Sequence, residues 1–160
     1  MKFVGNQFVF QTNKIMKDLS SQEGIGNIVE MEVYSCKQTK ESKKNNVLPK
    51  PLRFLISALE QHLPDYDFSE TSMNAFQIAS KEKLFTDLDF AIMTAIKNSN
   101  DANKILAYWT IVLKSILKLD KTQFYIFNFI EDKNNLLYLL YEKNGNKVVI
   151  LKVGNLINTN

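Results

Sequence analysis

The sequence has little cysteine: Cys36 is the one cysteine among 160 residues. A single thiol excludes an intrachain disulfide, and it excludes a zinc site built on several cysteines. A chain without disulfides is typical of an intracellular compartment. We interpret Cys36 as a small residue half-buried at a strand end, the alternative being a reactive thiol.

Arginine is equally scarce. Arg53 is the one arginine, so the net charge of +3 comes almost wholly from lysine. Bidentate recognition of guanine and of phosphate depends on the planar guanidinium group. The composition therefore disfavours a sequence-specific nucleic-acid reader. A surface rich in lysine could still contact phosphates weakly or bind an acidic protein partner.

Long apolar runs and glycine-rich motifs are also missing. No run approaches the roughly 18 apolar residues that cross a membrane, and no apolar core follows the first residues as in a signal peptide. Five glycines form no phosphate-binding loop. The sequence shows no nucleophile elbow, no Cys–His pair and no His–Glu metal spacing. We therefore predict a binding or regulatory domain that is not an enzyme and carries no cofactor or metal.

The apolar content is high enough for a sizeable core. Apolar residues make up 45% of the chain, which predicts one domain over residues 1–160 without a disulfide or metal staple. The lysine-rich segment 37–50, closed by Pro49 and Pro51, predicts a flexible linker or surface loop. Within it we consider a weak nuclear-import patch and phosphorylation at Ser42 or Thr39.

Helical spacing of apolar residues occurs in three strong stretches, which predict helices over about 52–63, 82–97 and 102–118. The short break at 98–101 predicts an antiparallel helix pair. Trp109 is expected to be a core anchor. Residues 72–80 predict a short helix or an irregular segment. We interpret His62 as a helix-end histidine favoured by the helix dipole, the alternative being a general base.

Alternating or continuous apolar stretches predict strands over about 2–4, 25–36, 123–130, 136–141 and 148–151. Asn144 and Gly145 predict a hairpin between the last two. Several strands are apolar on both faces, which is typical of a sheet covered on both sides. We therefore expect an α/β chain of the α+β type, with a mostly antiparallel central sheet packed with helices in a two-layer or three-layer sandwich.

The densest stretch of chemistry is 64–69, which reads Pro-Asp-Tyr-Asp-Phe-Ser. Pro64 biases the preceding residues away from the helix, and Asp67 or Ser69 can accept from backbone N–H groups to begin the next helix. Local physics predicts a corner between two helices with both rings buried. An alternative is a small metal-site or acid-site enzyme, in which Asp65 and Asp67 share a proton or a magnesium ion.

This hexapeptide resembles the signature of the Maf-one family, the global repressors of RNA polymerase III transcription. Further landmarks resemble that family in the same order along the chain, from the amino-terminal box to the last hairpin. They are Met1-Lys2-Phe3, residues 32–37, residues 54–59, Trp109, residues 125–128 and residues 137–143. The last hairpin departs from the family, because Asn144-Gly145-Asn146-Lys147 replaces a more basic turn. The insert after Lys37, which carries import and kinase sites in larger members, is very short.

The resemblance implies a negative regulator that binds RNA polymerase III and blocks its assembly at promoters with TFIIIB, whose Brf subunit is a further expected partner. It implies a monomer in the nucleus and cytoplasm. On this interpretation the partner-binding residues are Asp65, Tyr66 and Asp67 at the corner, together with Lys143 and Lys147.

Overall fold

The computed structural model describes residues 2–3, 10–11, 13–14, 18, 29–35, 50–128, 135–144 and 147–154. Within them the chain forms a six-stranded antiparallel sheet in the order β1-β2-β6-β5-β4-β3. The strands are β1 (Lys2–Phe3), β2 (Val29–Ser35), β3 (Phe76–Ala79), β4 (Thr122–Phe127), β5 (Asn135–Glu142) and β6 (Lys147–Gly154). The described helices are α3 (Lys50–His62), α4 (Lys81–Ala95) and α5 (Ser99–Ile116), with short 3-10 turns η1 (Met73–Ala75) and η2 (Leu119–Lys121).

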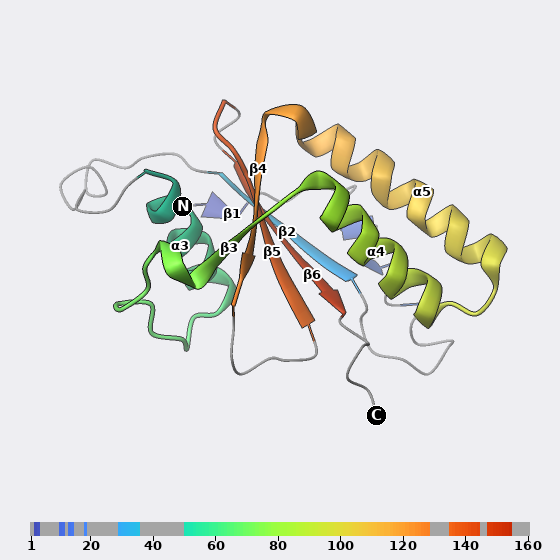
Figure 1. Cartoon of the computed structure of the whole chain (residues 1–160), viewed down its shortest axis with the longest axis horizontal. Helices are drawn as coiled ribbons and strands as arrows, with labels where there is room; N and C mark the ends of the chain where they lie inside the picture. Colours follow the sequence, from blue (N-terminus) through green and yellow to red (C-terminus); the bar gives the residue numbers. More distant parts are fainter. Residues whose placement is uncertain are drawn as a thin grey trace.

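The helices cover both faces of the sheet (Figure 1). Alternation along β4 sends Phe124 and Ile126 toward the antiparallel pair α4 and α5, and it sends Tyr125 and Phe127 toward α3. The central strands β5 and β6 supply apolar side chains to both layers. This arrangement confirms the expected α+β class with a mostly antiparallel sheet covered on both sides.

The strand register defines two opposite ends of the sheet. At one end Phe127 of β4 pairs with Leu137 of β5, and at the other end Thr122 pairs with Glu142, which in turn pairs with Lys147 of β6. These two ends are five residues apart along β4, or about 17 Å at the usual rise of a strand.

Local sequence explains where α4 and α5 begin. The Ser80 hydroxyl accepts from the backbone N–H of Lys83 at 3.1 Å, and the Asn98 side chain accepts from Asn100 at 3.0 Å and Asp101 at 3.3 Å. Such caps satisfy N–H groups that have no partner within the helix. Trp109 in the middle of α5 is fully buried, which confirms it as a core residue.

The carboxyl end of α5 is held by two charged residues of the β5–β6 hairpin. Lys147 donates from Nζ to the carbonyl of Ile116 at 3.2 Å, and the buried Glu142 accepts from the backbone N–H of Lys118 at 3.1 Å. A cation at this end complements the helix dipole. The hairpin therefore fixes α5 over the sheet.

Near the corner, the prediction of a short helix within 72–80 is right for Met73–Ala75 but misses a strand, and the prediction of a second α-helix directly after the corner is wrong. Residues 72–80 contain the edge strand β3, which pairs with β4 from Phe76↔Phe127 to Ala79↔Phe124, after the 3-10 turn η1 capped by Ser72. The hexapeptide therefore joins a helix to a turn and a strand, and not two helices. The Cys36 interpretation, most of segment 37–50 with Ser42 and Thr39, and Gly145 lie outside the described residues.

Candidate functional site

The corner begins where α3 stops. Leu63 continues the helical bonding with its N–H to the carbonyl of Leu59 at 2.7 Å, and Tyr66 donates back to the carbonyl of Leu63 at 3.1 Å, which closes a turn around Pro64. Proline has no N–H to extend the helix. Asp65 consequently stands at an exposed tip of the turn.

The two rings of the hexapeptide have different environments. Phe68 is 5% exposed and packs on Phe127 with ring centres 5.9 Å apart. Tyr66 stacks against Phe68 at 4.5 Å and meets the edge of Phe127 at 6.2 Å, yet it exposes 36% of its surface. The prediction of two buried rings therefore holds for Phe68 and is wrong for Tyr66. Phe68 anchors the corner, and Tyr66 presents one side of its ring to solvent.

Asp67 organises the backbone of the turn. Its Oδ1 accepts from the N–H of Ser69 at 2.9 Å, as predicted from the sequence, although no helix follows directly. The hydrogen bonds from the Ser69 backbone and side chain hold the pKa of the Asp67 carboxyl below its ordinary value. Asp67 is thus a carboxylate at neutral pH.

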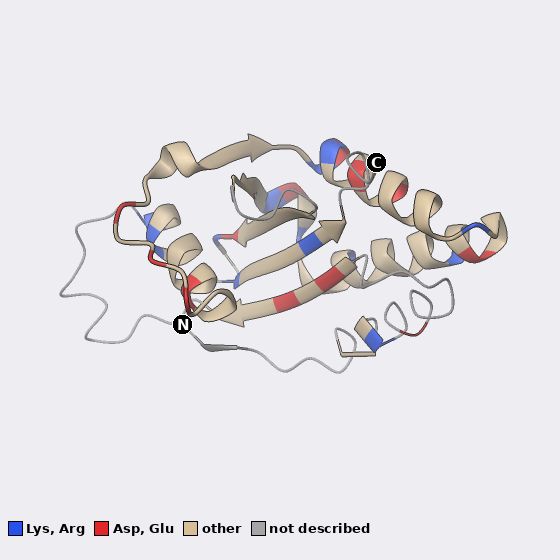
Figure 2. Ribbon diagram, turned by 90° about the horizontal axis from the view of Figure 1, so that it is seen from below, with Lys and Arg blue, Asp and Glu red and all other residues tan. Residues whose placement is uncertain are grey.

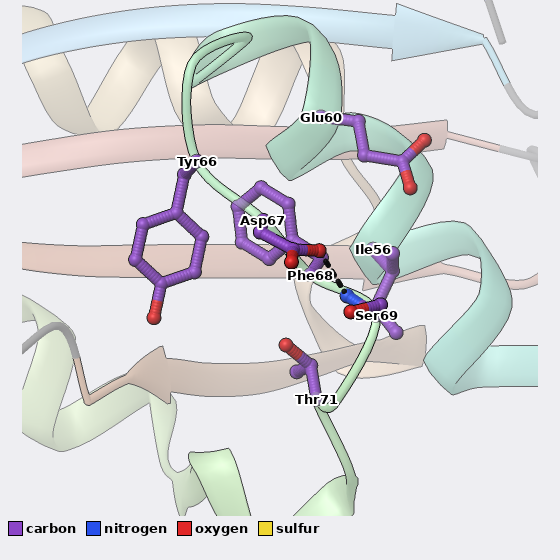
Figure 3. Close-up of a pocket in the computed structure, with 7 residues that line it drawn as sticks. All are labelled: Ile56, Glu60, Tyr66, Asp67, Phe68, Ser69 and Thr71. Atoms are coloured by element: carbon purple, nitrogen blue, oxygen red, sulfur yellow. Dashed lines mark hydrogen bonds between the residues drawn. The ribbon is translucent and has the colours of Figure 1, made fainter.

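A hollow of about 430 Å³ lies between α3 and the corner (Figure 3). Its lining contains apolar groups, two carboxylates and three hydroxyls: Ile56, Glu60, Tyr66, Asp67, Phe68, Ser69 and Thr71. Sequence reasoning missed the three that lie outside the hexapeptide. The spacing of Ile56 and Glu60, four residues apart on one face of α3, was the available signal, but nothing in the sequence placed that face against Thr71.

The surface around this hollow is acidic. Residues 54–80 contain four carboxylates and no lysine or arginine, so the segment carries −4, and the remaining residues must carry +7 because the whole chain carries +3. All four carboxylates, Glu60, Asp65, Asp67 and Glu70, are exposed. Figure 2 shows the turn after α3 marked by acidic positions. The corner therefore produces a local negative electrostatic potential on a protein whose net charge is positive.

A polar cluster ties the end of α3 to β2. His62 Nδ1 lies 2.9 Å from Glu32 Oε2, and the Tyr34 hydroxyl donates to the same oxygen. Burial raises the pKa of Glu32, but the hydrogen bonds from His62 and Tyr34 outweigh it and leave that pKa below its ordinary value. Burial, together with the Glu32 carboxylate, raises the pKa of Tyr34. The predicted position of His62 at the helix end is confirmed, whereas its carboxylate partner was not anticipated.

Two relatives match the chain by sequence, and no protein-family model matches it. Both are uncharacterized proteins of Encephalitozoon cuniculi (strain GB-M1), each 27% identical over 156 residues. The alignments cover 94% of this chain and 96% of each relative. The likeness thus extends over nearly the whole length of all three proteins.

Solved structures of known proteins decide the fold. Crystal structures of citrus MAF1 (Maf-one) in two crystal forms superpose with a TM-score of 0.63 in each case, at 22% and 20% identity. They cover 79% of this chain and 87% and 86% of the citrus chains. The chain has a Maf1-like fold.

In this Maf1-like fold the predicted partner-binding residues form two separate groups. Asp65, Tyr66 and Asp67 lie together at the corner, near Phe127. Lys143 follows Glu142 at the opposite end of the sheet and is exposed, while Lys147 is half-buried and already bonds the Ile116 carbonyl. The structure therefore does not bring the lysines to the acidic corner.

The enzyme alternative places Asp65 and Asp67 in an acid site or a metal site. No group of three or more His, Cys, Asp or Glu side chains that could hold a metal occurs in the described part of the chain. The lowered pKa of Asp67 comes from its hydrogen bonds with Ser69 and not from a second carboxylate. In the described residues, no helix has the length and apolar character needed to cross a membrane.

Proposed function

We propose that this chain is a Maf1-like negative regulator of RNA polymerase III transcription. The observation that supports the proposal best is the Maf1-like fold, which extends over 79% of the chain, with the hexapeptide 64–69 at a corner where all of its residues except Phe68 are exposed. The regulator would bind the polymerase and block its assembly with TFIIIB, through the Brf subunit or beside it. The mechanism is steric and allosteric and makes or breaks no covalent bond.

The corner has the physical properties of a protein-binding surface. Tyr66 offers a ring that is half in solvent and fixed by Phe68 and Phe127, so little side-chain entropy is lost when a partner covers it. Exposed Asp65 and Asp67 flank that ring. Aromatic anchors with polar neighbours are the residues that dominate binding energy in interfaces. We propose Asp65, Tyr66 and Asp67 as the principal contacts, with Lys143 and Lys147 as separate contacts at the far end.

The proposal extends to where and in what form the regulator acts. It would be a monomer in the nucleus and cytoplasm, and phosphorylation of Ser42 or Thr39 would control its access to the polymerase. A phosphate adds about −1.5 to −2 charges to the lysine-rich segment, which is enough to change an electrostatic contact.

Transcription of a tRNA gene in an extract with the homologous polymerase tests this function, alongside a polymerase II template. We expect added protein to reduce the tRNA transcript selectively. The variant Tyr66→Ala should lose most of the repression, since the ring is the expected anchor, while the exposed Asp89→Asn on α4 serves as a matched control and should repress like the wild type. Equal inhibition of both templates, or none of either, would contradict the proposal.

A further inference from the structure

We propose that the hollow between α3 and residues 66–71 binds a cationic side chain, lysine or arginine, presented by a protein partner. The proposal rests on the proposed function for the identity of that partner, and on the chemistry of the hollow for everything else. Figure 3 shows the side chains that form it.

The walls match the two parts of such a side chain. Ile56 and the rings of Tyr66 and Phe68 form an apolar surface for the methylene stem. Glu60 and Asp67 supply carboxylates for the ammonium or guanidinium head, and the hydroxyls of Ser69 and Thr71 can accept further N–H groups. An aromatic face beside the head adds a cation–π attraction.

The negative charge of the hollow is not neutralised from within. Neither Glu60 nor Asp67 forms an ion pair with another side chain in the described residues. Among the residues that the structure describes, Asp67 is bonded only by its neighbour Ser69, through the backbone N–H and the side chain. A cation entering the hollow would therefore meet carboxylates that form no ion pair within the described residues.

The residues around the hollow repel an anionic ligand, and they hold the walls of the hollow in place. Residues 54–80 carry −4, which repels phosphate, nucleic acid and acidic peptide segments. The walls are held from both sides, by Phe68 on the sheet and by the His62–Glu32 contact at the end of α3. A volume of about 430 Å³ lies within the roughly 300–1,000 Å³ of ligand pockets and accommodates a long side chain with the peptide groups beside it.

The experiment is an amide NMR titration of the full chain with N-acetyl-arginine amide and N-acetyl-lysine amide, with N-acetyl-glutamine amide as the neutral control. We expect saturable shifts confined to residues 56–71 with both cations and none with the neutral compound. Added salt should weaken the binding of both cations. Glu60→Gln should weaken the apparent affinity by about tenfold, as the loss of one charge-assisted contact implies, and Asp89→Asn should leave it unchanged.

The proposal would be overturned if the shifts are absent, if they spread evenly over all carboxylates, or if Glu60→Gln binds with the affinity of the wild type. Glu60 is exposed, so the variant is expected to fold, and its amide spectrum reports this directly. The outcome is independent of the transcription test. Repression without cation binding would leave the function intact and refute this chemistry, while cation binding without repression would refute the polymerase as the partner.

Discussion

At the scale of single residues, the two rings of the hexapeptide are expected to have different roles: Phe68 stabilises the fold, and Tyr66 binds the partner. Phe68 is 5% exposed, whereas Tyr66 is 36% exposed. We expect Phe68→Ala to lower the free energy of unfolding by about 3–5 kcal/mol, because it leaves a cavity against Phe127. Tyr66→Ala removes the ring contacts with Phe68 and Phe127 from a partly exposed position and should cost about 1 kcal/mol.

Urea unfolding of both variants measures this difference. The two curves should be compared with that of Asp89→Asn, which changes an exposed side chain on α4 and should unfold like the wild type. If Tyr66→Ala destabilises as strongly as Phe68→Ala, Tyr66 is a core residue, and its assignment to the partner surface fails.

At the scale of elements, we expect the attachment of α3 to β2 to weaken at low pH, because it includes the Glu32 carboxylate. The pKa of Glu32 lies below its ordinary value of 4.5 in the folded chain, so the folded state binds this proton less readily than the unfolded state. Glu32 therefore contributes stability above pH 4.5 that is lost as the pH falls through its folded pKa. His62, Tyr34 and Lys152 are the groups that face it.

We expect Glu32→Gln to be less stable than the wild type at neutral pH, and the gap between them to close as the pH falls below 4.5. Thermal unfolding of the two proteins across that range measures the gap. Asp89→Asn provides the control for a general effect of removing one negative charge. A gap that stays constant with pH would mean that the carboxylate of Glu32 contributes no charge-dependent stability.

Also at this scale, the sequence predicts elements that carry their own periodic pattern and misses those that depend on a distant partner. The alternation of Phe124 and Ile126 with Tyr125 and Phe127 was enough to place β4 between two layers. The four residues of β3 have no such pattern, and pairing with β4, far along the chain, makes them a strand. Likewise Glu32 and His62 are 30 residues apart, and no local signal joins them.

The hollow illustrates the same limit for the candidate site. The hexapeptide was identifiable from its density of rings and carboxylates. Ile56 and Glu60 belong to an ordinary amphipathic helix, and they become part of a site only because α3 packs on the sheet beside the corner. A cluster of chemical groups that are adjacent in the sequence can be predicted from it. A hollow formed by segments that are apart in the sequence appears only when the chain is packed.

At the scale of the whole molecule, the proposed contact residues lie at two opposite ends of the sheet. The corner with Asp65 lies near Phe127, and the exposed Lys143 follows Glu142 at the opposite end. The strand register separates these ends by about 17 Å, which exceeds the Debye length of about 8 Å at physiological ionic strength. The charges at one end should therefore have little effect on the binding free energy at the other end.

A double-mutant cycle on polymerase binding tests this independence. We expect Asp65→Asn and Lys143→Gln each to weaken binding, and the double variant to show the sum of the two losses within about 0.3–0.5 kcal/mol, as is typical of distant sites. Equilibrium binding to purified RNA polymerase III at fixed salt gives the four affinities, and Asp89→Asn controls for net charge. A coupling well beyond that limit would mean that the two ends contact one continuous partner surface whose fit depends on both, and a loss confined to Asp65→Asn would remove Lys143 from the interface.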